Sequence, residues 1–250
     1  MKSFALAASF AAAFFAAQAH ALSAGDIAVI AYNADGDDNF AWVALTDIAA
    51  NTVINFTDAS WQDTAFRSTE HLDAGGPLTW TSDVTLAAGI VVSYSGDDLN
   101  TWSVGTAGGI GMGLSNSGDQ LFVFEGSTAS PDFVYGLQFA NASGIIAAPT
   151  VSSSTNTTNV PDALSLAAGT MVDVGNFDDG YYSGITSGTQ AELLAAIADS
   201  GNWTRGNDAF ATSTWASSFQ VTPVPEAETY AMMLAGLGLV GFMAARRRRG

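Results

Sequence analysis

The sequence predicts an all-β fold, an antiparallel β-sandwich of the immunoglobulin-like or jelly-roll type, with one short helix in its body and a helix near each chain end. Eight short runs rich in Val, Ile, Phe, Tyr and Thr indicate strands, because these residues favour strands. Gly, Asp, Asn and Ser separate the runs, and the 250 residues include 26 Gly, as expected where turns need positive φ. Many short strands joined by frequent turns are typical of a sandwich.

The expected strands, in chain order, are residues 26–32, 40–47, 52–57, 78–81, 90–94, 120–125, 133–139 and 170–174. Asp35-Gly36 lies between the first two and predicts a tight hairpin. A polar, low-complexity stretch at 150–159 predicts an exposed loop.

A turn pattern recurs before three of these strands, at 48–54, 86–92 and 166–172. Each copy has an apolar residue, two Ala, and then Asn51, Gly89 or Gly169. Asn and Gly tolerate positive φ, so the pattern predicts a turn that starts a strand. The irregular spacing of the copies argues against a solenoid.

One helix is expected near residue 190. Thr189 and Glu192 have capping-box spacing, and Leu193, Leu194 and Ile197 form an apolar stripe. We expect Gly201 to end this helix and the helix to cover an end or edge of the sandwich.

Residues 1–21 have the three parts of a secretory signal peptide. Lys2 supplies the positive start, an apolar run follows, and Ala19-His20-Ala21 supplies small residues before a cut. We expect a signal helix that signal peptidase removes after Ala21, so that the body, residues 22–222, is exported.

Residues 223–250 form a distinct tail. Pro223 and Pro225 break any helix that arrives from the body. The 16 uncharged residues at 230–245 predict a transmembrane helix about 24 Å long, which flanking Arg side chains can extend by snorkelling. The terminal cluster of Arg246, Arg247, Arg248 and Arg249 predicts a cytoplasmic end, which makes the precursor an inner-membrane protein with its body outside.

This tail resembles the PEP-CTERM sorting signal. The resemblance rests on the order of three parts: the motif Val224, Pro225 and Glu226, the apolar helix, and the Arg cluster. It implies processing by exosortase, a membrane protease-transpeptidase of bacteria that make extracellular polysaccharide. Ala227 stands where the name-giving motif has a second Pro, so the cleavage position stays open.

The body is strongly acidic. Of 24 Asp and Glu, all but Glu226 and Glu228 lie in it, whereas its only Lys or Arg residues are Arg67 and Arg205, so its formal charge is −20. Such a surface repels phosphate backbones, and we expect no nucleic-acid partner. The absence of Cys excludes thiol catalysis and disulfides.

The sequence does not favour an enzyme, and we assign no catalytic residues. Arg67, Glu70 and His71 lie close together, and a base, an acid and a cation could form a hydrolytic site. A polar loop explains them as well, and the Ser residues lack the G-x-S-x-G pattern. A secreted hydrolase is therefore the weakest of the alternatives.

We expect no organic cofactor, and the candidate metal is calcium. Asn33, Asp35, Asp37 and Asp38 place oxygen-bearing side chains in one turn, and hard oxygen ligands suit Ca²⁺. Asp97-Asp98 and Asp178-Asp179 add acidic pairs elsewhere. The spacing does not fit an EF-hand, and Asp, Asn and Gly also form turns without a metal.

The body offers two further hints. Residues 114–124 are similar to a turn and strand of lamin-tail-like immunoglobulin-type domains. All six Trp lie in the body; they could stack on sugar rings, but we expect most of them in the core. The resemblance of the tail to the PEP-CTERM signal implies a cell-surface or extracellular protein, a structural or interaction component of a biofilm or polysaccharide matrix. The alternative for the body is a carbohydrate- or calcium-binding module.

Overall fold

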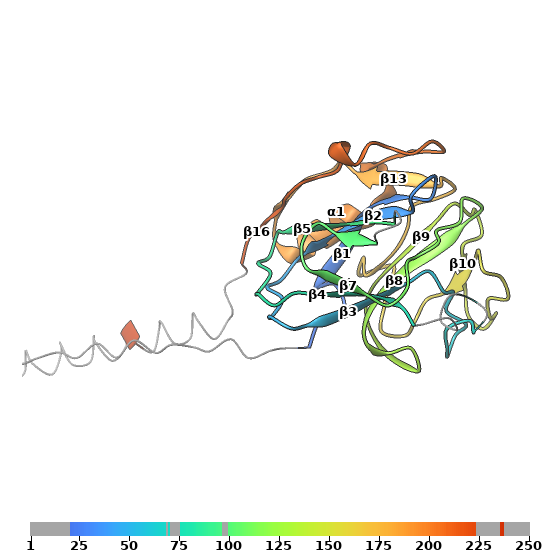
Figure 1. Cartoon of the computed structure of the whole chain (residues 1–250), viewed down its shortest axis with the longest axis horizontal. Coiled ribbons are helices and arrows are strands. Elements are labelled where there is room, and N and C mark those ends of the chain that lie inside the picture. The colour runs from blue at the N-terminus through green and yellow to red at the C-terminus, as the bar shows by residue number, and fades with distance from the viewer. Residues whose placement is uncertain (1–20, 69, 71–75, 97–99, 224–235, 238–250) are drawn as a thin grey trace, which may run out of the picture.

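The protein is a sandwich of two six-stranded β-sheets, as the sequence predicted. The computed structural model describes residues 21–68, 70, 76–96, 100–223 and 236–237 (Figure 1). The expected signal helix and transmembrane helix lie outside these residues, apart from the last residue of the first and residues 236–237 of the second.

The first sheet is antiparallel throughout. Its spatial order is β15 (Trp203–Gly206), β13 (Asp179–Tyr182), β1 (Ile27–Asn33), β2 (Asn39–Ala44), β5 (Val91–Ser95) and β6 (Thr101–Trp102). The expected hairpin joins β1 to β2, with Asn33 opposite Asn39 and Gly36 at φ +89° in the turn. Every residue of β1 is buried, so this strand is covered on both faces.

The second sheet pairs β12 with β9 in parallel and is otherwise antiparallel. Its spatial order is β12 (Met171–Asp173), β9 (Ser130–Phe139), β8 (Asp119–Ser127), β3 (Val53–Thr57), β4 (Leu78–Thr81) and β7 (Thr106–Gly108). Two short parallel pairs lie outside the sheets: β10 (Ile145–Ile146) with β11 (Thr158–Asn159), and β14 (Ser187–Gly188) with β16 (Gln220–Val221).

All eight expected strands are present, with bounds shifted by a few residues. The recurrent turn is also confirmed, because Asn51, Gly89 and Gly169 have φ values of 66°, 88° and 72° and precede β3, β5 and β12. The first two copies pair with each other through a bridge between Ile48 and Leu86.

The helix α1 (Gln190–Ala198) begins as expected with a capping box. Its buried Leu193 and Ile197 belong to the core cluster, and the helix lies against β1, β12 and β14. The prediction for its end is wrong. The helix ends at Asp199, whose extended backbone stops it and whose Oδ1 accepts the N–H of Gly201 in a following 3₁₀ turn (Ser200–Asn202).

Aromatic side chains from both sheets fill the core. The rings of Trp42 (β2) and Trp80 (β4) meet edge to face at 5.2 Å, and those of Tyr32 (β1) and Phe139 (β9) stack at 4.5 Å. All six Trp are at most 8% exposed, as expected for core residues. Their rings therefore do not form an open stacking platform for sugars.

Residues 150–159 form the expected exposed loop only in part: residues 150, 151, 153 and 155 are exposed, but other positions are not. Ser152, Thr158 and Asn159 are buried, and the Asn159 amide nitrogen donates to Ile146 O and Thr150 O. Thr158 Oγ1 accepts the backbone N–H of Trp61 at 2.8 Å. Polar residues are buried here because each one satisfies a backbone group, which composition alone does not reveal.

The two ends of the described body converge. The Gln190 side chain donates to Gly25 O at 2.9 Å, and Gln190 lines an open groove together with Val221, Thr222 and Pro223. Leu22 N donates to Glu125 Oε2 at 2.6 Å. In Figure 1 both ends leave the sandwich on the same side.

Candidate functional site

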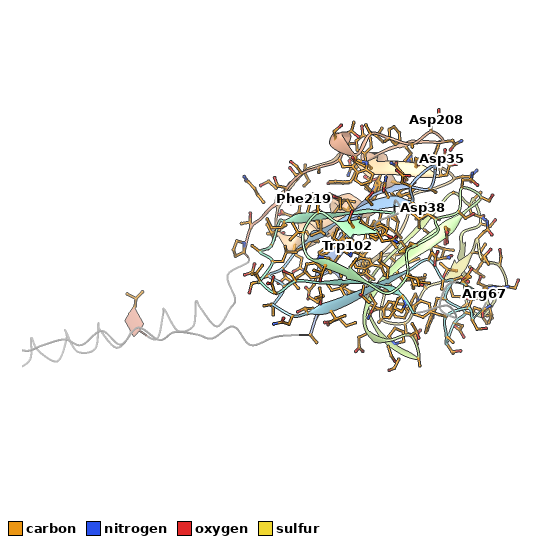
Figure 2. All side chains as sticks on the ribbon, viewed as in Figure 1. Asp35, Asp38, Arg67, Trp102, Asp208 and Phe219 are labelled. Carbon is orange, nitrogen blue, oxygen red and sulfur yellow. The ribbon has the colours of Figure 1, made fainter. Side chains whose placement is uncertain are left out.

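Three carboxylates meet where the β1–β2 turn reaches β13. One oxygen each from Asp35, Asp178 and Asp179 lies within 4.8 Å of the other two. The pairing of Asn33 with Asp179 brings these positions together across 144 residues of chain between Asp35 and Asp179. Asp35 and Asp178 are partly exposed, whereas Asp179 is 0% exposed (Figure 2 labels Asp35).

Asp179 is held firmly at one oxygen only. Its Oδ1 accepts the backbone N–H of Ala34 at 3.1 Å, whereas its buried Oδ2 has no hydrogen-bond partner in the described part of the chain. Burial raises the pKa of Asp179 to about 6, with Asp178 and Asp35 adding repulsion, although the N–H groups of Asp35 and Ala34 oppose the shift.

Two hydrogen bonds position Asp178, one at its backbone carbonyl and one at its side chain. Its carbonyl accepts the N–H of Ala34 at 3.1 Å. In the orientation that satisfies its neighbours, the Asn207 side-chain nitrogen donates to Asp178 Oδ1 at 3.2 Å and to Gly206 O at 3.1 Å.

The structure unites only part of the predicted ligand set. Among the described residues, Asp37 and Asp38 lie outside the three-carboxylate group, although they occupy the same turn as Asp35. The Asn33 amide instead joins the turn to a distant loop: its Nδ2 donates to Phe210 O at 2.8 Å and its Oδ1 accepts Phe210 N at 3.2 Å. The pair Asp97-Asp98 lies outside the described residues.

A second acidic region surrounds Asp119 on the other sheet. Asp119 is buried, its Oδ2 accepts Ser115 N at 2.8 Å and its Oδ1 accepts Gln120 N at 2.9 Å. Burial first, and then the charge of Asp58, raises the pKa of Asp119 well above its usual range. Because both oxygens hold backbone groups, this carboxyl fastens a turn to β8.

Of the hydrolytic candidate, Glu70 is described and His71 is not. Glu70 Oε2 accepts the backbone N–H of Ser60 at 2.6 Å, and burial raises the pKa of Glu70. This contact fastens a loop, as Asp119 does on β8.

The body ends directly before the sorting tail. Phe219 N donates to Gly89 O at 2.8 Å, and Thr222 N donates to Gly188 O at 2.7 Å. The predicted motif Val224, Pro225 and Glu226 and the cluster Arg246–Arg249 follow outside the described residues. Within the part of the chain that the structure describes, no helix has the length and apolar character needed to cross a membrane.

A folded acidic body followed at once by a Pro-containing motif, an apolar run and terminal Arg residues defines an exported protein with a C-terminal sorting signal. Residues 223–249 match the family model described as the PEP-CTERM protein-sorting motif. The chain therefore carries this signal, which supports its assignment as an exosortase substrate. The motif implies a secreted precursor that passes through the membrane and becomes a cell-surface or extracellular protein.

Searches of curated proteins and of solved structures found no match to this chain. The family match covers the tail only, so the resemblance of residues 114–124 to lamin-tail-like domains stays a prediction. The local structure expected there is present, since a turn that ends at Gly118 leads into β8.

Proposed function

We propose that the processed body is a non-catalytic structural or interaction component of an extracellular polysaccharide matrix. The observation that carries this proposal is the PEP-CTERM motif at residues 223–249, which begins one residue after Thr222, where the last backbone hydrogen bond among the described residues is made. In the proposed sequence of events, signal peptidase removes residues 1–21, the tail holds the precursor in the inner membrane, and exosortase then releases the body.

The composition of the body supports this assignment. Both Lys2 and the four terminal Arg lie in segments that processing would remove, so the body keeps a formal charge of −20. A polyanion of this kind stays soluble and avoids other anionic polymers unless cations bridge them. The well-filled core and hydrogen-bonded loops suit a persistent structural part.

The sorting step is tested in the producing bacterium by cell fractionation and intact-mass spectrometry. We expect the wild-type body outside the inner membrane, with a mass that lacks residues 1–21 and the C-terminal tail. Deletion of the exosortase gene should leave the full tail on a membrane-bound precursor. Replacing Arg246–Arg249 with Ser should give the same retention or misplacement, whereas Lys at these positions preserves the charge and should allow delivery.

The matrix role has its own test. Extracellular polysaccharide from the same culture should sediment with the processed protein, and a strain that lacks the protein should form a weaker biofilm. Normal delivery of the Ser variant would contradict the role given to the Arg cluster. The matrix role would be contradicted if the processed protein did not sediment with the polysaccharide and if its deletion left the biofilm unchanged. Neither result would affect the sorting step.

A further inference from the structure

The three-carboxylate group of Asp35, Asp178 and Asp179 concentrates negative charge where the β1–β2 turn reaches β13. The charged side chains that act most strongly on Asp179 are Asp178 and Asp35, which are both acidic. The neighbouring base, Arg205, donates to Val174 O at 2.5 Å and lies over the Phe177 ring at 5.1 Å. Like charges held this close repel one another, so the group favours a cation.

A second observation points the same way. Asp179 is 0% exposed, and its Oδ2 has no donor among the described residues. A buried carboxylate oxygen without a partner is costly, and native proteins almost always satisfy such a group with a donor, a water or an ion. Since Oδ1 of the same carboxylate is already held by Ala34 N, the side chain is fixed in place with one acceptor unused.

We propose that Asp35, Asp178 and Asp179 bind one Ca²⁺ ion. Ca²⁺ lies about 2.3–2.6 Å from its oxygen ligands, so oxygens on opposite sides of one ion are about 4.6–5.2 Å apart. The three carboxylates have oxygens within 4.8 Å of one another, so their separations fit ligands of one ion. The two partly exposed members leave a route for the ion and room for water ligands.

The donor set favours Ca²⁺ over other common metals. It offers only oxygen, whereas zinc sites use His nitrogen or Cys sulfur as a rule. Mg²⁺ requires close octahedral contacts near 2.0–2.1 Å and releases its waters reluctantly, while Ca²⁺ accepts irregular geometry with six to eight oxygens. Extracellular modules bind Ca²⁺ at about 10⁻⁴ to 10⁻³ M, so an exported body needs only a modest site.

Bound Ca²⁺ would connect the β1–β2 turn to the start of β13. These segments are 144 residues apart in sequence and already share hydrogen bonds from Ala34 N to Asp178 O and to Asp179 Oδ1. The ion would neutralise the repulsion that these hydrogen bonds now oppose, so its binding should stabilise the fold.

The test uses the full chain, purified in detergent, in thermal unfolding and calorimetric titration with CaCl₂ and, separately, MgCl₂. We expect 5 mM Ca²⁺ to raise the melting temperature relative to EDTA by a few degrees, and Mg²⁺ to have a smaller effect. Asp35→Asn and Asp178→Asn should weaken Ca²⁺ binding roughly tenfold or more, since affinity follows the number of charged ligands.

The matched control is Asp37→Asn, which removes the same charge from the same turn but lies outside the group; it should bind Ca²⁺ like the wild type. In EDTA, Asp35→Asn should melt at or above the wild-type temperature because repulsion is relieved. A purely structural role of Asp35 predicts lower melting in both conditions.

Three results would overturn the proposal: unchanged melting up to 10 mM Ca²⁺, an equal response to Mg²⁺, or a loss of binding in Asp37→Asn as large as in Asp35→Asn. Asp179→Asn is a weaker test because that buried side chain also holds Ala34 N.

Discussion

Gly89 links the recurrent turn to the segment that leads into the sorting tail, and Gly89→Ala should detach that segment. A Cβ at position 89 would lie 2.2 Å from the carbonyl oxygen of Phe219, and the backbone there has φ +88°. The same substitution endangers the hydrogen bond from Phe219 N to Gly89 O at 2.8 Å. Phe219 is 5% exposed and its ring stacks on Tyr182 at 6.0 Å.

Three contributions set the loss of unfolding free energy in Gly89→Ala. An Ala at positive φ costs about 1–2 kcal/mol. The lost hydrogen bond costs about 1 kcal/mol, and partial exposure of a buried Phe costs roughly 1–2 kcal/mol more. The matched control is Gly36→Ala, which has φ +89° and no atom within 4 Å of the added Cβ, so it carries the backbone cost alone.

Urea unfolding of the full chain in EDTA, followed by Trp fluorescence, compares the two variants. We expect Gly89→Ala to be about 2–3 kcal/mol less stable than Gly36→Ala. For an m-value of about 2–3 kcal/mol/M, the urea midpoint of Gly89→Ala should then be lower by about 1 M. Limited proteolysis should also cut Gly89→Ala in residues 210–222 before the rest of the body. Equal midpoints for the two variants would refute the reasoning.

Three further predictions concern single groups. Tyr135→Phe should leave stability unchanged or raise it by up to about 1 kcal/mol, because the buried Tyr135 hydroxyl has no hydrogen-bond partner among the residues that the structure describes. Tyr32→Phe should cost about 1 kcal/mol, because the Tyr32 hydroxyl donates to Phe177 O. The opposite order of the two urea midpoints would contradict this. Thr189→Ala should cost about 1 kcal/mol by removing the α1 capping box and Thr189→Ser should restore it, which the same midpoints measure; an Ala variant as stable as the wild type would deny the cap a role. The pKa values of Asp119 and Asp179 are raised in the folded protein, so the stability that these groups contribute is present at low pH and is lost as pH rises. For Asp179 this loss falls between the usual pKa of 3.8 and about 6. Without metal, the protein should therefore have a lower urea midpoint at pH 8 than at pH 5, and a higher midpoint at pH 8 would count against these shifts.

Local sequence predicted the strands that are long and apolar. Strands such as β1 and β8 bury residues on both faces and therefore read as apolar runs. The short strand β13 was not predicted, because Asp179-Gly180 at its start looks like a turn. Gly180 is needed there, since a Cβ would lie 2.9 Å from the Tyr32 ring.

Local sequence also could not show that the residues of the candidate site lie together. Sequence reasoning found Asp35 by its place in an acidic turn, and it noted the pair Asp178-Asp179 separately. Only the pairing of β1 with β13 joins them, and such pairing depends on tertiary contacts rather than on neighbours in the chain. Asn33 looked like a ligand, but its side chain holds the backbone of Phe210.

The convergence of the two chain ends beside Gln190 gives the sandwich a near end and a far end. Gly25 and Pro223 lie close to this side chain, whereas Asp35 and Asp208 lie at the opposite end in Figure 2. A body tethered through either terminus would therefore hold the end that carries Asp35 and Asp208, its acidic tip, away from the tether. Ions and neighbouring polymers would meet that tip first for as long as the tether holds the body.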